Sequence, residues 1–210
     1  SNIIILCVEP HQAEQVLQEI APELKQSQHI LISIVSGLGI EQIKVQINKN
    51  INVIRAMPNI AILIGESMTC LAAQNSRNEH LKIAQDIFNA VGETLIIEEE
   101  QMSGATSLGA CGIAFFLRAI RATSQGGIEI GFHAEDALKI AANTAKGAAS
   151  ILTHSGNHPE SEIDKVTTPM GCTISGLNQM EHDGFSSAMI KGIKISAEKA
   201  ARLYTREKKE

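Results

Sequence analysis

The stretch DKVTTPMGCTISGL, residues 164–177, carries the residue types best suited to binding a small anion. A hydroxyl pair, Thr167 and Thr168, precedes a proline, and Gly171 follows that proline closely. Proline fixes φ and removes an N–H donor, whereas glycine adopts backbone conformations closed to other residues. Thr173 is then the expected N-cap of a helix with apolar periodicity. Hydroxyls and free N–H groups at a helix N-terminus suit a carboxylate, although an ordinary loop-to-helix junction has the same pattern.

The N-terminal half contains the strands and helices that would position other reactive groups. Apolar runs typical of strands alternate there with segments of helical spacing, which predicts half of a Rossmann domain with right-handed crossovers. The expected strands are 3–8, 30–35, 51–56, 68–73 and 93–97, and the expected helices are 12–25, 40–47 and a segment near 81–88. We expect the strand at 3–8 to be covered on both faces. Ligands bind such sheets beyond the carboxyl ends of the strands, here residues 7–10, 36–39 and 57–60.

A dinucleotide fold normally begins with a strand and a G-x-G-x-x-G turn, and this sequence has neither in the expected place. The pair Gly37-x-Gly39 follows a strand but lacks the third glycine, so it is a weak candidate. We therefore expect the sequence to lack roughly the first third of a Rossmann domain. The residue that would select a 2′-phosphate falls in that part, so the sequence does not distinguish NADPH from NADH.

The C-terminal half is predicted to be helical, with the boundary between the two domains at about Gln101. This gives a partial Rossmann domain at residues 1–100 and an all-α domain at residues 101–210. Long helices are expected at 110–126, 134–153 and 184–208, and the apolar run after Thr173 predicts another. Aromatic residues make up only 3% of the chain. Such Ala-rich helices usually complete their core with a second subunit, which predicts a homodimer or a larger homo-oligomer.

Composition excludes several classes of partner. The net charge of −5 leaves no electrostatic footprint for nucleic acid or an anionic membrane surface. No apolar run is expected to reach the roughly 18–20 residues that span a bilayer, and the N-terminus has no signal-peptide pattern. The four scattered cysteines lack metal-ligand spacing and predict reduced thiols in a cytoplasmic protein. His154 and His158 do not make a convincing metal pair, so no metal is predicted, and Glu98, Glu99 and Glu100 are expected to be solvated.

The segment DKVTTPMGCTISGLNQMEHDGF closely resembles the C-terminal signature of pyrroline-5-carboxylate reductases, D-x-V-[TS]-[TS]-P-G-G-x-T-x-x-x-L followed by L-E-x-x-G-F. Met170 stands where the family has its first glycine, and Cys172 occupies a variable position. The resemblance implies that the substrate carboxylate is bound by Thr168, Gly171, Cys172 and Thr173. It also implies that the Thr173 hydroxyl lies near the ring nitrogen, which is the catalytic position.

Two N-terminal segments resemble the cofactor loops of the same family. VIRAMPNIAILIGESMTCLAA is similar to V-x-R-x-M-P-N-T-P, which implies that the nicotinamide half of the cofactor is lined by Met57, Pro58 and Asn59. CVEP stands where the family usually has A-V-K-P, which adds Val8, Glu9 and Pro10 to the cofactor side. Glu9 reverses the charge of the family's lysine, and a carboxylate beside a pyrophosphate is repulsive by about 1 kcal/mol.

The segment SLGACGIAFFLRAI is a drifted version of the family's S-G-S-G-P-A-Y-x-F. Gly112 and Ala114 match, whereas Cys111, Ile113 and Phe115 replace serine, proline and tyrosine.

The resemblance implies reduction of 1-pyrroline-5-carboxylate to L-proline by NADPH or NADH. It also implies an interlocked dimer whose active site lies between the Rossmann domain of one subunit and the helical domain of its partner. Two alternatives stay open. One is a catalytically impaired homologue that acts as a dimeric scaffold or regulatory protein, as Glu9, Ile60, Ile113 and Met170 suggest. The other is a related imine or β-hydroxyacid-type reductase.

Overall fold

The computed structural model describes residues 2–74 and 78–203. By its internal contacts the chain separates into two compact units. One unit comprises residues 1–113 together with 193–210, and the other comprises residues 114–192. Each unit is described by itself below.

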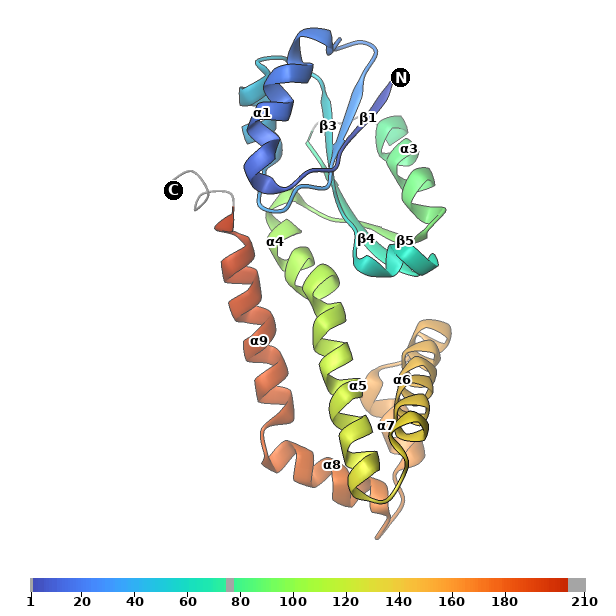
Figure 1. Cartoon of the computed structure of the whole chain (residues 1–210). Coiled ribbons are helices and arrows are strands. Elements are labelled where there is room, and N and C mark those ends of the chain that lie inside the picture. Colours follow the sequence, from blue (N-terminus) through green and yellow to red (C-terminus); the bar gives the residue numbers. More distant parts are fainter. Residues whose placement is uncertain (1, 75–77, 204–210) are drawn as a thin grey trace. The chain divides into compact units, whose positions relative to one another are not determined.

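A mixed β-sheet forms the centre of the first unit (Figure 1). Its strands are β1 (Ile3–Leu6), β2 (Ile30–Ser33), β3 (Asn52–Met57), β4 (Ser67–Ala73) and β5 (Gly92–Ile96). They lie in sequence order, with β1, β2 and β3 parallel, β4 antiparallel to β3, and β5 parallel to β4. Every strand predicted from the apolar runs is present, with ends that differ by a few residues.

Helices cover both faces of this sheet because the strands alternate apolar side chains between the faces. Leu31 and Val53 pack with α1 (Pro10–Ile20) and α2 (Ile40–Ile47) in one core cluster. Ile32 and Ile54 point to the opposite face, where they pack with Ala84 and Phe88 of α3 (Asn78–Asn89). Short 3-10 turns, η1 (Ala21–Glu23) and η2 (Ile60–Ile64), follow α1 and β3. The two faces in Figure 1 carry α1 and α3 respectively.

The first strand is less buried than predicted. β1 ends at Leu6 and lies at an edge of the sheet, and Ile5 leaves 46% of its surface exposed. The expectation of a strand covered on both faces is therefore only partly met: Ile3 packs against the cluster that contains Ala84 and Phe88 of α3, whereas Ile5 is exposed.

The remainder of the described chain is helical, as predicted. The elements are η3 (Glu99–Gln101), α4 (Met102–Ala105), the π-helical turn η4 (Thr106–Cys111), α5 (Gly112–Glu129), α6 (Ala134–Ser155), α7 (Pro159–Val166), α8 (Cys172–His182) and α9 (Phe185–Ala200). Neither the π-helical turn nor α7 was predicted. Pro159 at the first position of α7 is a recognised start signal, whereas η4 has no comparable local signal. The predicted end of the last helix, Lys208, lies outside the described residues.

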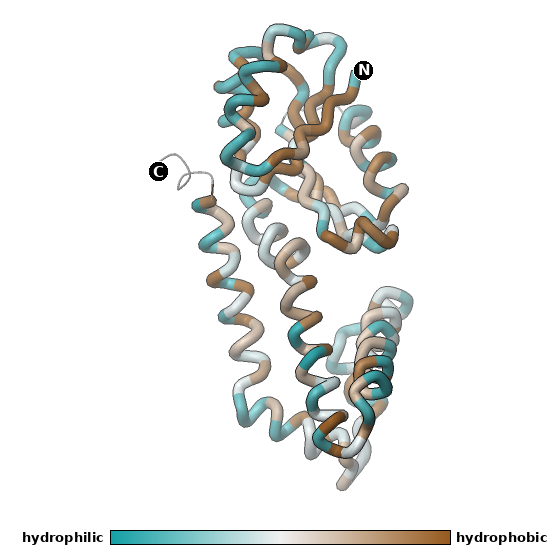
Figure 2. The backbone as a smooth tube through the Cα atoms, viewed as in Figure 1, coloured by the Kyte–Doolittle hydropathy of each residue, from teal (hydrophilic) through white to brown (hydrophobic). Residues whose placement is uncertain are grey.

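The helices of the second unit carry apolar residues along their length (Figure 2), and many of these side chains are exposed. Gly127 on α5 permits one close approach, since a Cβ there would lie 3.0 Å from the Cβ of Ala137 on α6. Phe116, Leu117 and Ile190 are each more than half exposed. Surface of this extent usually marks an interface, as the sequence predicts.

The helical run Glu99–Glu129 has the length and apolar composition of a membrane-crossing helix, by those two criteria alone. This corrects the expectation that no apolar run reaches that length. Only 17% of its most apolar window is buried within the chain. A helix whose exposed face is covered by another copy of the chain meets the same two criteria.

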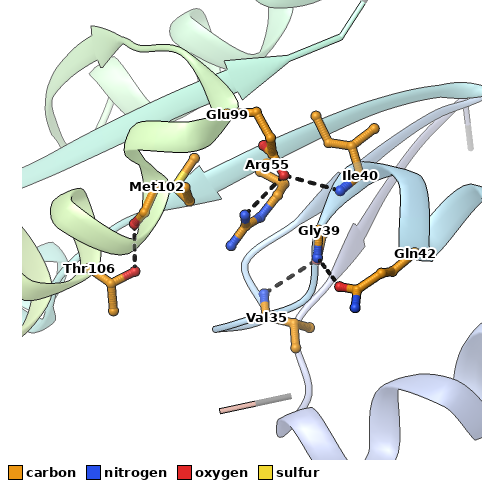
Figure 3. A network of polar contacts seen from close by, with 9 residues as sticks. Val35, Gly39, Ile40, Gln42, Arg55, Glu99, Met102 and Thr106 are labelled. Atoms are coloured by element: carbon orange, nitrogen blue, oxygen red, sulfur yellow. Dashed lines mark hydrogen bonds and ion pairs between the residues drawn. The ribbon is translucent and has the colours of Figure 1, made fainter. Parts of the chain in front are cut away.

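A buried ion pair joins the start of the helical region to the sheet (Figure 3). Arg55 on β3 is 7% exposed, and its Nη1 donates to Glu99 Oε1 at 3.1 Å. The same oxygen accepts a hydrogen bond from the backbone N–H of Ile40, the first residue of α2, at 3.2 Å. The expectation that Glu99 is solvated is therefore wrong, because a buried guanidinium requires a partner of opposite charge. Glu98 and Glu100 are exposed, as predicted.

We expect Glu99→Gln to lower the free energy of unfolding by about 1–3 kcal/mol, because it leaves the buried Arg55 guanidinium without a counter-charge. The Glu99 side chain is 29% exposed, so the loss should stay below that of a fully buried pair. Urea unfolding followed by circular dichroism measures the change. Glu100→Gln is the matched control, since it removes the same charge from an exposed neighbour and should change stability by less than about 0.5 kcal/mol. Equal losses in both variants would contradict the proposed role of Glu99.

Candidate functional site

Three loops meet at one edge of the sheet in the first unit. The parallel register pairs Leu6 with Ser33 and Ser33 with Arg55, so β1, β2 and β3 finish side by side. The backbone N–H of Ile34 donates to the carbonyl of Leu6 at 3.1 Å and keeps the first two ends together. The predicted cofactor segments 8–10 and 57–59 therefore flank the end of β2 at the edge where such sheets bind ligands.

The loop after β1 leads directly into the N-terminus of α1. Glu9 is the N-cap residue, its backbone N–H donates to Gln12 Oε1 at 3.3 Å, and Pro10 occupies the first helical turn. The Glu9 side chain is 76% exposed, and its carboxylate lies 3.3 Å from Nδ1 of His11. A carboxylate directed into solvent is screened by water and salt, which weakens its repulsion of a nearby phosphate. Val8 and Pro10 are half-buried.

The loop after β3 begins with a buried side chain and continues into the exposed turn η2. Met57 is 5% exposed and packs in a core cluster with Cys70, Ala72 and Met102. Burial raises the pKa of the Cys70 thiol, in keeping with a thiol that belongs to the core. Asn59 caps η2: its Oδ1 accepts a hydrogen bond from the N–H of Ala61 at 3.0 Å. Pro58 and Asn59 are half-buried at the sheet edge.

The pair Gly37-x-Gly39 is not available as a phosphate-binding turn. The N–H of Gly39 donates to Gln42 Oε1 at 2.8 Å, and the N–H of Ile40 donates to the Glu99 carboxylate (Figure 3). A helix N-terminus attracts anions through its free N–H groups, and at α2 an internal carboxylate occupies that position. Gly37-x-Gly39, the weak phosphate-binding candidate in the sequence, is thus the start of a helix whose N–H groups are already bonded within the protein.

In the second unit, the predicted substrate residues form a tight turn between α7 and α8. The N–H of Gly171 donates to the carbonyl of Thr168 at 2.9 Å. Pro169 is the second residue of this turn, and Met170 is the third with a φ of 61°. Proline at the second position and a positive φ at the third are the pattern of a type II turn, which normally takes glycine there. The Met170 side chain points entirely into solvent, so it does not crowd the turn.

The two threonines before the proline have different surroundings. Thr167 is the C-cap residue of α7, and its hydroxyl donates to the carbonyl of Asp164 at 3.2 Å. Thr168 is exposed, and its Oγ1 lies 2.6 Å from the position that a Cβ on Gly171 would occupy. Only glycine therefore fits at Gly171. The hydroxyl of Thr168 rather than that of Thr167 lies at the start of α8.

Helix α8 begins at Cys172, with Gly171 as its N-cap residue and no side-chain cap among the described residues. The prediction that Thr173 is the N-cap is wrong, because the turn already places Gly171 in that position and Thr173 within the first helical turn. Cys172 is exposed and Thr173 is half-buried. An uncapped first turn leaves its N–H groups for a bound anion, and hydroxyls of Thr168 and Thr173 lie in the same segment.

The segment before the turn is held by its own side chains. Lys165 and Asn157 donate to Glu162 Oε1 at 2.7 and 2.6 Å, and these hydrogen bonds lower the pKa of Glu162. His154 Nδ1 lies 2.8 Å from the Ser150 carbonyl, and His158 Nδ1 accepts a hydrogen bond from the N–H of Glu160 at 3.2 Å. Within residues 2–74 and 78–203 no three His, Cys, Asp or Glu side chains are grouped as metal ligands.

The structure therefore brings the predicted residues together in two separate groups. The loops after β1 and β3 belong to the first unit, and the turn from Thr168 to Thr173 belongs to the second. Sequence reasoning missed the Arg55–Glu99 pair. Its available signal was an arginine inside an otherwise apolar strand, which requires a partner when the strand is buried.

Comparison with known proteins agrees with this arrangement. Residues 99–203 match the family model described as pyrroline-5-carboxylate reductase dimerisation. The chain is 54% identical to pyrroline-5-carboxylate reductase 1 of Dictyostelium discoideum over 98% of its length, and it spans 39% of that relative. It is 47% identical to pyrroline-5-carboxylate reductase 2 of the same organism, with 95% of this chain and 72% of the relative covered.

Solved structures give the same result. The crystal structure of Plasmodium falciparum pyrroline carboxylate reductase with NADP bound superimposes with a TM-score of 0.89 at 28% identity, covering 97% of this chain and 77% of that one. The predicted fold class, a Rossmann-like α/β domain followed by an all-α dimerisation domain, is confirmed. The match of the dimerisation model and the identity to these relatives establish that the chain belongs to the pyrroline-5-carboxylate reductase family.

Proposed function

We propose that the whole protein reduces 1-pyrroline-5-carboxylate to L-proline with a nicotinamide cofactor, the last step of proline synthesis. The observation that carries this proposal is the uncapped N-terminus of α8 behind a turn in which Gly171 packs on Thr168. Relatives of this name match nearly the full length of the chain.

The turn would bind the carboxylate of the cyclic imine. The N–H groups of the first turn of α8 and the Thr168 hydroxyl supply donors, and the helix dipole adds a favourable field for the anion. Cys172 contributes its backbone N–H, since a thiol is a weak donor. Thr173 would place its hydroxyl beside the ring nitrogen, where it stabilises the protonated imine. Fixed positioning of this kind can lower a barrier by several kcal/mol without a formal catalytic base.

The loops at the sheet edge would hold the nicotinamide half of the cofactor. Val8, Pro10, Pro58 and Asn59 leave half-buried surface there, Glu9 directs its charge into water, and Met57 offers only its backbone. These residues fit an uncharged ring and exclude water from it. When bound, the nicotinamide supplies the hydride. We propose NADPH rather than NADH as the cofactor, in keeping with the NADP that the Plasmodium falciparum relative binds.

The exposed apolar helices are proposed to pair with a second copy of the chain, giving a homodimer or a larger homo-oligomer. Coverage by a partner would bury side chains such as Phe116, Leu117 and Ile190, which one chain leaves in water. Cytoplasmic location is also proposed, and the free cysteines, two of them exposed, are in keeping with a reducing compartment.

Thr173→Ala should lower kcat/KM for pyrroline-5-carboxylate by about 100-fold, because it removes a hydrogen bond to a charged group at the reacting ring. Gly171→Ala should act mainly on KM, since its Cβ would lie 2.6 Å from Thr168 Oγ1 and displace the turn. The decrease in NADPH absorbance measures both effects.

Two controls make this test specific. Thr173→Ser keeps the hydroxyl and should retain most of the activity. Thr123→Ala removes a hydroxyl that only bonds the helix backbone of α5 and should leave the rate unchanged. If the unmodified protein neither binds NAD(P)H nor consumes it with the imine, the proposal fails and the catalytically impaired homologue is the better reading.

Met170→Gly should raise the free energy of unfolding by about 0.5–1 kcal/mol, because a side chain at positive φ is strained and glycine is not. The side chain is fully exposed, so no contact with the described residues is lost that would offset this gain. Thermal and urea unfolding measure the change. Met170→Val should destabilise the protein, since a branched Cβ increases the strain, and a loss of stability in the glycine variant would contradict this description of the turn.

A further inference from the structure

Asn59 connects two segments at the sheet edge through both ends of its side-chain amide. Its Oδ1 accepts a hydrogen bond from the N–H of Ala61 at 3.0 Å, which caps η2. Its Nδ2 donates to the carbonyl of Gly109 at 3.3 Å. The backbone N–H of Asn59 donates to Ser67 Oγ at 3.1 Å, so the residue is also fixed to β4. The amide is therefore engaged with the protein itself on both its oxygen and its nitrogen.

Gly109 lies in the π-helical turn η4, which is a rare and weak form of helix. Side chains hold this turn at three points. Thr106 Oγ1 donates to the Met102 carbonyl at 2.8 Å, and Ser107 Oγ, which is fully buried, donates to the Ile193 carbonyl at 2.7 Å. The third point is the bond from Asn59. This bond differs from the other two because its donor, Asn59, lies in the loop after β3.

The bond therefore couples the loop proposed to hold the cofactor to the first part of the helical region. Without it, the loop would keep the cap of η2 and its bond to β4, but it would lose its hydrogen bond to η4. Hydride transfer depends steeply on distance, and a misplacement of about 1 Å can cost 100-fold in rate.

We propose that Asn59 is a positioning residue for the reductase, which acts through the Gly109 carbonyl to keep the loop 57–64 and the turn 106–111 in fixed register. The proposal rests on the proposed reductase function for its effect on rate. The tie itself is independent of that function. In this proposal the side chain of Asn59 acts on the protein itself rather than on the cofactor.

Two substitutions isolate the tie from the helix cap. Asn59→Asp and Asn59→Ser both keep an oxygen that can cap η2, because Asp and Ser are good N-cap residues. Asp replaces the donor to Gly109 with an acceptor that repels its carbonyl, and Ser does not reach it. Ser107→Ala is the matched control, since it loosens η4 from α9 without altering the loop after β3.

The measurements are amide hydrogen exchange of peptides covering 57–64 and 104–113, together with kcat, the KM for the imine and the NADPH dissociation constant. For Asn59→Asp we expect faster exchange in both peptides and a kcat lowered by about ten-fold or more. The KM for the imine should stay within about two-fold, because the carboxylate is bound by the turn before α8. Ser107→Ala should accelerate exchange in 104–113 only. Asn59→Ser should follow Asn59→Asp with a smaller effect.

Two results would overturn the proposal. Unchanged exchange in 104–113 with both Asn59 variants would show that no tie exists. A dissociation constant for NADPH raised about ten-fold with unchanged exchange in 104–113 would show that the side chain contacts the cofactor directly. If the unmodified protein has no reductase activity, the proposed function fails, and the exchange measurement still decides whether the tie exists.

Discussion

The Arg55 guanidinium is buried in the middle strand of the sheet. Its burial is the constraint on which the arrangement at the ends of β2 and β3 depends. A buried cation is costly unless an anion meets it, and the chain supplies Glu99 from the start of its helical region. That requirement places η3 against the end of β3. Because the same carboxylate oxygen accepts from the N–H of Ile40, it also fixes the start of α2 at the end of β2. One charge pair thus sets the positions of three segments that are distant in sequence.

The same pair explains why the N-termini of α2 and α8 have different roles. Both α2 and α8 follow a glycine and have N–H groups directed out of the helix. The N-terminus of α2 is satisfied by Glu99, so it serves the fold. The N-terminus of α8 has no side-chain cap among the described residues, and Gly171 packs closely against Thr168, whose hydroxyl therefore lies beside the start of the helix. Sequence alone gives the two starts a similar appearance, and only the tertiary partner separates them.

Much of the fold could be predicted because its signals are local. The five apolar runs gave the strands, and helical spacing gave α1, α2, α5 and α6. The antiparallel direction of β4 and the π-helical turn η4 depend on contacts between distant residues, such as Asn59 with Gly109, and have no local signal. At the candidate site, the hydroxyl pair was recognised from its motif. Its division into a capping Thr167 and a free Thr168 follows from the turn geometry, which depends on the positive φ of Met170.

The exposed apolar helices of the second unit have a consequence for how this protein responds to dilution. Within one chain only a few side chains there, such as Ala137 and Ala141, are fully buried, so folding a single copy gains little hydrophobic free energy. If association covers the remaining surface, folding of the unit and assembly form one equilibrium governed by mass action. The melting temperature then rises with protein concentration, and the cellular abundance of the chain becomes part of what keeps it folded.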